Sequence, residues 1–292
     1  MRKKWFPLPL LFMFLLLFPQ ESSGNSLNEH WEETFTRQTN AWIEELIQKG
    51  GVFSSWRDGK ISKEPLGPNS RTWIVTIRKG ESKVGYLVIG EDDQGHFLLL
   101  EYGTDGNSLF DEDTLSSYYP DTKATKKEKI YQGISSYFLV KGNGEERVFD
   151  AKTTEAIPEE WSGMEVRTPT DDLHNLGPPL SPKEMTQSSV AERKEMEEAF
   201  PIEAILKKRR KVDEPKEIIL NHTYLDIRIR HGKIHLLLPV VGFHRWDQEI
   251  YYIALDQEGY RFLPLFPKGK ETDGKFVPTV SLENLFTVAN DS

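Results

Sequence analysis

Three histidines in the last third of the chain are the side chains best suited to bind a metal ion. They are His231, His235 and His244, and neutral imidazole is a common zinc ligand. His231 and His235 flank a turn, and His244 follows the next predicted strand, so nothing in the spacing brings the rings together. No H-E-x-x-H motif, the most specific zinc hydrolase signal, is present. We therefore interpret them as strand histidines and expect neither a metal site nor a cofactor.

Two clusters of carboxylates have the chemistry to hold calcium or to act as acids and bases. They are Glu91-Asp92-Asp93 and Asp111-Glu112-Asp113. A calcium loop needs oxygen ligands at alternating positions, a central glycine and a distant glutamate, and Leu109 and Ser116 break the pattern that Asp105 begins. We interpret the first cluster as an acidic hairpin turn and the second as negative charge at a helix N-terminus.

The sequence lacks the usual motifs of nucleophilic catalysis. There is no cysteine, which excludes a cysteine nucleophile, a thiolate metal site and a disulfide. There is neither a G-x-S-x-G elbow nor an S-x-x-K pair. Residues 269–275 have the spacing of a phosphate-binding loop, but Phe276 stands where Ser or Thr must hold magnesium. We expect no catalytic residue and assign no binding residue.

The first residues have the layout of a secretion signal. Basic residues at positions 2–4 precede an apolar run over 5–18 and a polar exit. The run is shorter than the roughly 20 residues of a membrane-spanning helix. Ser22 and Gly24 are small residues at the −3 and −1 positions of a cleavage site, so cleavage is expected between Gly24 and Asn25. A retained N-terminal anchor is the alternative.

The chain is acidic, with 46 Asp and Glu against 37 Lys and Arg and a formal net charge of −9. Removal of the basic leader makes the remainder more negative. This charge disfavours nucleic acid and anionic lipid as partners. The content of 37% hydrophobic and 28% charged residues is that of a globular chain. We expect a secreted or cell-wall-associated protein that has a protein partner and no permanent membrane span.

Hydrophobic periodicity predicts one N-terminal helix. Ser26 and Glu29 match a capping box, and Gly50-Gly51 supplies the stop. Between them, apolar residues recur at helical spacing, which we interpret as a core stripe and not as a ligand site. The stripe consists of Leu27, Trp31, Phe35, Trp42, Ile43, Leu46 and Ile47.

Two groups of strands are predicted from apolar runs bounded by turn residues. Short helices are expected over 108–119 and 282–286. A similar hairpin pattern occurs at 86–100 and 251–265, which leaves open whether the two groups are related repeats. The strands are expected over 71–78, 84–89, 96–102, 130–140 and 147–149 in the first group, and over 217–230, 234–243, 249–256 and 260–266 in the second.

These elements predict an α+β fold, in which the N-terminal helix packs on an antiparallel sheet. Within the expected linker, residues 188–211 are helix-prone, and the basic run at 207–211 (KKRRK) is interpreted as a solvated helix end. The predicted parts are a signal peptide over 1–24, an N-terminal α+β domain over 25–157, a Pro-rich and helical linker over 158–216, and a second, mostly antiparallel β domain over 217–292.

The segment YFLVKGNGEERVFDAKTTEAIP (137–158) resembles the closing hairpin of a PepSY-type domain. In that family a strand ends in a D-A-x-T-G-E-like turn before a final apolar residue. Thr154 stands here where the family has glycine. PepSY-type domains occur in peptidase propeptides and envelope proteins, where they inhibit a partner or assist its folding. The matching residues are Asp150, Ala151, Thr153, Glu155 and Ile157.

A second resemblance covers more of the chain. Segments within 65–110 and 238–265 are similar to uncharacterised secreted proteins of the bacilli, and to segments that precede papain-like cysteine peptidase domains of the bacteriocin-processing type. Because the cysteine of that peptidase is absent, the resemblance implies the accessory part without the enzyme. It favours a non-enzymatic binding or accessory protein that modulates a secreted peptidase or an envelope partner. An extracellular hydrolase with a site of dispersed acids and histidines, and a structural cell-wall or spore-coat component, are the alternatives.

Overall fold

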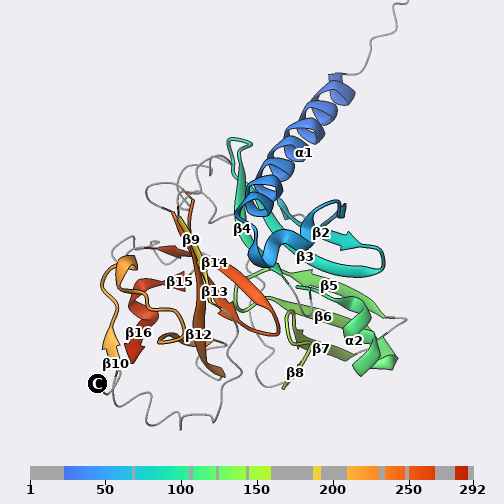
Figure 1. The fold of residues 1–292 in the computed structure, drawn as a ribbon. Helices are drawn as coiled ribbons and strands as arrows, with labels where there is room; N and C mark the ends of the chain where they lie inside the picture. The colour runs from blue at the N-terminus through green and yellow to red at the C-terminus, as the bar shows by residue number, and fades with distance from the viewer. Residues whose placement is uncertain are drawn as a thin grey trace, which may run out of the picture. The chain divides into compact units, whose positions relative to one another are not determined.

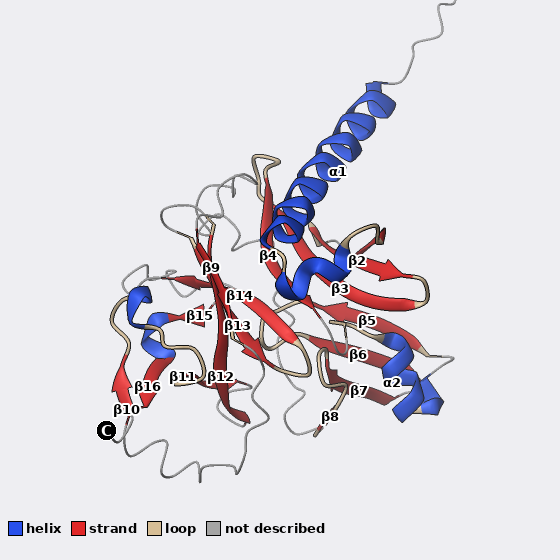
Figure 2. Cartoon of the chain, viewed as in Figure 1, coloured by secondary structure: helices blue, strands red, loops and turns tan. Residues whose placement is uncertain are grey.

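The chain is described here from a computed structural model (Figure 1). It divides into a short N-terminal unit that ends at Arg37 and a larger unit that begins at Gln38. Strands dominate and nearly all pair antiparallel, so the expected α+β class with an N-terminal helix is confirmed (Figure 2). None of the described helices is long and apolar enough to cross a bilayer. The described residues are 23–67, 70–104, 108–122, 125–142, 145–158, 187–191, 209–229, 234–246, 250–266 and 280–288.

The N-terminal helix is α1 (Ser23–Lys49). It already contains Ser26, so the predicted capping box at Ser26 and Glu29 is wrong. Gly24 and Asn25, the residues of the predicted cleavage site, lie in its first turn. The predicted end is confirmed, because Gly50 follows Lys49 with a positive φ of 72° that glycine adopts without strain.

The apolar stripe of α1 is confirmed where its side chains are described. Within the short unit, the rings of Trp31 and Phe35 stack with centroids 5.2 Å apart. Within the larger unit, Trp42, Ile43 and Leu46 are buried. An amphipathic helix gains most of its stability from burying such a face.

A 12-stranded sheet forms most of the larger unit, in the order β1-β2-β3-β4-β14-β13-β12-β11-β16-β10, with β9 on β12 and β15 on β14. Because β4 pairs with β14, the ranges 25–157 and 217–292, which were predicted as separate domains, share this sheet. Its strands are β1 (Lys60–Pro65), β2 (Thr72–Lys79), β3 (Ser82–Glu91), β4 (Phe97–Thr104), β9 (Gln187–Val190), β10 (Arg209–Lys211), β11 (Thr223–Ile229), β12 (Ile234–Arg245), β13 (Tyr251–Asp256), β14 (Tyr260–Phe266), β15 (Val280–Ser281) and β16 (Leu285–Val288).

The two segments with similar sequence patterns, 86–100 and 251–265, are hairpins of this one sheet. They are β3–β4 and β13–β14, and they meet where β4 pairs with β14. The last pair before the turn is Glu91 with Phe97 in the first hairpin, but Asp256 with Tyr260 in the second, so the second turn is shorter.

A second sheet of four strands lies within the first half of the chain. Its order is β5-β6-β7-β8, from β5 (Lys126–Ile130), β6 (Tyr137–Gly142), β7 (Glu145–Asp150) and β8 (Ala156–Ile157). The predicted helix over 108–119 is confirmed as α2 (Glu112–Tyr118), which the 3-10 turn η2 (Pro120–Thr122) follows. One apolar core joins side chains of α2, this sheet and strands β2 to β4, among them Leu115, Phe138, Phe149, Ile74 and Val88.

The helix-prone stretch 188–211 is not helical at its described ends. These ends form β9, which pairs with β12, and β10, which pairs with β16. A strand ladder supplies partners for every second N–H and C=O of an edge strand, and such pairing outweighs a weak local helix preference. The basic run is therefore partly an edge strand, and residues 192–208 lie outside the described part. Likewise 282–286 is the 3-10 turn η6 (Leu282–Asn284) followed by β16.

Between α1 and β1, the 3-10 helix η1 (Gly51–Trp56) contacts β2 and β3. The indole of Trp56 donates a hydrogen bond of 2.9 Å to the carbonyl of Val84. The ring lies over Gly85, where an added β-carbon would come within 2.2 Å of Trp56 Nε1. Gly85 is thus required by a close approach and not by its backbone angles.

Candidate functional site

The histidines considered as metal ligands lie apart. His235 and His244 stand near opposite ends of β12, and His231 lies outside the described residues. His235 Nε2 is 2.6 Å from a carboxylate oxygen of Asp226, and His244 Nδ1 is 2.7 Å from the hydroxyl of Tyr102. Among the described residues, no group of three or more His, Asp or Glu side chains is arranged to hold a metal ion.

His244 is a buried, neutral hydrogen-bond acceptor. The Nε1–H of Trp246 donates to the Tyr102 hydroxyl at 3.0 Å, so that hydroxyl can give its own proton to His244 Nδ1. Phe262 stacks on the imidazole with ring centroids 4.5 Å apart. Burial, with a smaller contribution from the charge of Lys49, lowers the pKa of His244 to about 3. A group this hard to protonate is a poor general base near neutral pH.

Both acidic clusters have the local roles predicted for them. Asp111 caps α2 by accepting hydrogen bonds from the amides of Asp113 and Thr114, and its carboxylate is 2.6 Å from Lys83 Nζ. Burial acts to raise the pKa of Asp111, but the hydrogen bonds from Lys83 and the backbone outweigh it and hold the pKa below its ordinary value. In the β3–β4 turn, Asp92 accepts from the amides of the residues two and four positions later.

A buried ion pair that the sequence analysis did not assign joins β4 to β14. Arg261 Nε donates to Glu101 Oε1 at 2.7 Å and its Nη2 donates to Oε2 at 3.1 Å, a bidentate arrangement. The side chains are 1% and 0% exposed. Further hydrogen bonds from Arg261 reach the side chain of Gln257 and the carbonyl of Gly133. Tyr86 donates to Glu101 at 2.7 Å, so the charges are compensated on several sides.

A β-bulge places Glu101 where this pair can form. In the β3–β4 ladder Val88 pairs with Glu101 but Ile89 pairs with Leu99, which leaves Leu100 as the extra residue. The bulge changes which face the following side chains point to. Glu101 therefore shares a face with Val88, whereas Tyr102 points to the other face. The signal available in the sequence was a lone charge inside an apolar strand (LLLEY), which indicates a buried partner.

Among the described residues, the last strand of the large sheet, β10, pairs only with β16, so its other edge is unpaired there. The amide of Val212 donates to the carbonyl of Leu285 at 3.2 Å, which makes these two a hydrogen-bonded pair. Such pairs alternate along an antiparallel ladder. Arg210 therefore also bonds to β16, whereas Arg209 and Lys211 direct their backbone N–H and C=O groups away from it.

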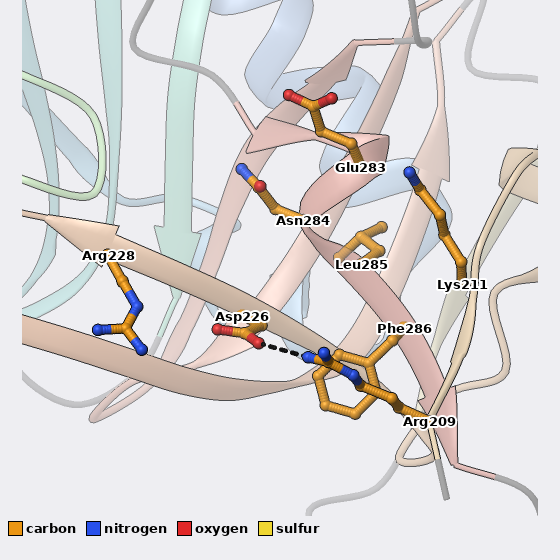
Figure 3. A pocket seen from close by; sticks show the side chains of 8 residues that line it. All are labelled: Arg209, Lys211, Asp226, Arg228, Glu283, Asn284, Leu285 and Phe286. Atoms are coloured by element: carbon orange, nitrogen blue, oxygen red, sulfur yellow. Dashed lines mark hydrogen bonds and ion pairs between the residues drawn. The ribbon is translucent and has the colours of Figure 1, made fainter. Parts of the chain in front are cut away.

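A pocket of about 620 Å³ lies beside this edge (Figure 3). Arg209 and Lys211 line it from β10 on one side, and Arg228 lines it from β11 on the other. Between them, the Asp226 carboxylate is 3.5 Å from Arg209 Nη1 and 2.6 Å from His235 Nε2. The remaining lining residues are Glu283, Asn284, Leu285 and Phe286. We call the open side of β10 together with this pocket the β10 edge site.

The opposite end of the same sheet is protected. In β1, the amide of Leu66 donates to the carbonyl of Thr72 at 2.8 Å, and the same alternation turns Ile61, Lys63 and Pro65 outward. Pro65 has no N–H, and proline and lysine on an edge strand hinder pairing with another chain. No proline interrupts β10, so its edge is more open to an added strand.

No family model matches the sequence, and neither a curated protein nor a solved structure gives a match. No residue of the β10 edge site was predicted to bind a ligand. The signal available in the sequence was the basic run at 207–211, which contrasts with the net charge of −9.

Proposed function

We propose that this chain is an exported, non-enzymatic binding or accessory protein that holds an extended segment of a protein partner along β10. The single observation that carries the proposal is the set of outward backbone groups on Arg209 and Lys211 beside a pocket. A partner segment can use those groups to add a strand to the sheet, in the manner of β-strand addition. Main-chain hydrogen bonds then supply affinity, and the pocket supplies selectivity.

The buried polar groups of the larger unit favour binding over hydrolysis. A hydrolase needs an accessible nucleophile or base that converges with other polar groups in a pocket. Here Glu101, Arg261 and His244 are each about 1% exposed or less, and each is hydrogen-bonded to other protein groups. In the β10 edge site, the Asp226 carboxylate is engaged by Arg209 and His235.

The PepSY-like reading of residues 137–158 is part of the proposal, and the local geometry supports it. The hairpin β6–β7 leads into a turn in which Asp150 accepts from the amides of Lys152 and Thr153, both at 2.8 Å. Thr154 has a φ of 59°, the conformation that favours the glycine found at this position in the family. An accessory role toward a secreted peptidase or envelope protein follows from this resemblance.

The proposal can be tested by capturing the partner with two variants at one position. Lys211→Pro removes an outward N–H and leaves the bonds of Arg210 to β16 in place, and Lys211→Ala removes the same charge but keeps the N–H. Immobilised wild type should retain a protein from the producer's secreted fraction. Lys211→Ala, which loses one charge contact, should still retain part of the same protein, and Lys211→Pro should lose it. Circular dichroism and thermal unfolding verify that both variants fold. Equal retention by the three proteins, or none by the wild type, contradicts the proposal.

A further inference from the structure

We infer that the segment held at the β10 edge site is acidic and carries its carboxylates at alternating positions, i and i+2. The inference rests on the strand addition proposed above and adds the chemistry of the ligand. It follows from the faces of β10, from the charges of the pocket and from the spacing that a strand imposes.

The side chains of β10 divide between two faces of the sheet. Arg209 and Lys211 both line the pocket, because residues two apart in a strand share a face. Arg210 points to the other face, where its Nη2 is 3.7 Å from Glu217. The two residues of β10 with outward backbone groups are therefore also the two residues of this strand that present cations to the pocket.

The pocket lining has three cations, Arg209, Lys211 and Arg228, against two carboxylates, Asp226 and Glu283, so one positive charge is left without a counter-charge. Asp226 is shared between Arg209 and His235. Within the described part of the chain, neither Lys211 nor Arg228 lies in an ion pair, and both are exposed. The local cations contrast with the net charge of −9 for the whole chain. A carboxylate is the simplest partner for them, because lysine and arginine donate charge-assisted hydrogen bonds to it.

Strand geometry then fixes the spacing of the ligand's charges. Residues directly opposite in neighbouring strands have β-carbons roughly 4.5–5.5 Å apart, and opposite charges there attract. The two ligand residues opposite Arg209 and Lys211 are i and i+2, and both point to the pocket face. The residue between them points to the face of Arg210. Adjacent carboxylates cannot both reach the pocket cations, because successive side chains alternate between faces.

The test uses the full-length protein and labelled peptides in fluorescence anisotropy at 0.15 M salt. The first peptide carries glutamates at alternating positions between threonines and valines. A second has the same composition with adjacent glutamates, a third has glutamine for glutamate, and a fourth is the first peptide with N-methyl groups on its backbone. The first should bind tightest, with a loss of roughly two- to five-fold for each glutamate replaced or moved off the face. The N-methylated peptide should not bind.

Charge-matched variants locate the effect on the protein. Arg209→Ala and Lys211→Ala should weaken binding of the alternating peptide, whereas Arg210→Ala removes the same charge from the opposite face and should leave binding unchanged. If glutamine and glutamate peptides bind equally and N-methylation abolishes both, the acidic ligand is refuted while strand addition stands. If the adjacent-glutamate and N-methylated peptides bind as well as the first, charge alone acts and both ideas are refuted. Binding of none of the peptides overturns the inference.

Discussion

Acidification should destabilise this protein through His244, whose side chain is 1% exposed near the end of β12. Its ordinary pKa is 6.5, and burial lowers the pKa to about 3 in the folded chain. The unfolded chain therefore binds a proton at a pH where the folded chain does not. Falling pH then favours unfolding. The stability linked to His244 is complete above pH 6.5 and is lost progressively as the pH falls toward 3.

The size of the effect follows from the separation of the two pKa values. Each pH unit between them removes about 1.4 kcal/mol from the free energy of unfolding. Between pH 7.5 and pH 5 the loss from His244 is therefore about 2 kcal/mol. A His244→Gln variant cannot take up this proton, so its stability should fall less steeply over the same interval. Urea unfolding at constant ionic strength, followed by tryptophan fluorescence at pH 7.5, 6 and 5, measures both slopes.

A matched control separates His244 from the other groups that titrate. His30→Gln removes an exposed histidine of α1, and this variant should keep the wild-type slope. The reasoning is refuted if the wild type and His244→Gln lose stability in parallel between pH 7.5 and pH 5. Such a result would mean that the folded chain binds a proton at His244 as readily as the unfolded chain does.

Three further outcomes are expected from substitutions. Arg261→Met should lower the free energy of unfolding by about 3–5 kcal/mol, because it leaves Glu101 buried without its cation. In denaturant titrations, the double variant Arg261→Met with Glu101→Met should lose far less stability than the sum of the two single variants. At Thr154, where φ is 59°, glycine should give a protein about 1 kcal/mol more stable than alanine in thermal unfolding, and the opposite order would show that the turn carries no strain. Gly85→Ala should cost about 1–3 kcal/mol by overlap with Trp56; a second change, Trp56→Leu, should recover part of that loss, and no recovery would contradict the overlap.

The elements that were predicted well from the sequence are those in which apolar residues recur at a regular spacing. The apolar stripe of α1 and the alternation of apolar and polar residues in RTWIVTIR each mark the face that the element buries. The strands that escaped prediction are polar. β1 (KISKEP) is exposed at every position and β10 (RRK) likewise. Their extended form comes from pairing with β2 and β16 and not from a pattern in their own residues.

The candidate site was less predictable than the fold, for a geometric reason. A pocket between Lys211 on β10 and Arg228 on β11 exists because β16 is inserted between those strands. No local sequence pattern predicts such an insertion of one strand between two others. The carboxylate clusters, by contrast, were interpreted correctly because a helix cap such as Asp111 contacts only its own first turn.

The buried polar pairs also explain how two predicted domains can share one sheet in a single register. All eight residues of β4 are buried, so the apolar pattern does not distinguish its two faces. Charge and hydrogen bonding distinguish the two faces. On one face Glu101 meets Arg261, and on the other Tyr102 meets His244. A slip of one residue between β4 and β14 would turn Glu101 toward the aromatic face, away from Arg261, and leave a buried charge without a partner. The cost of that state selects the observed register, where hydrophobic burial alone would not.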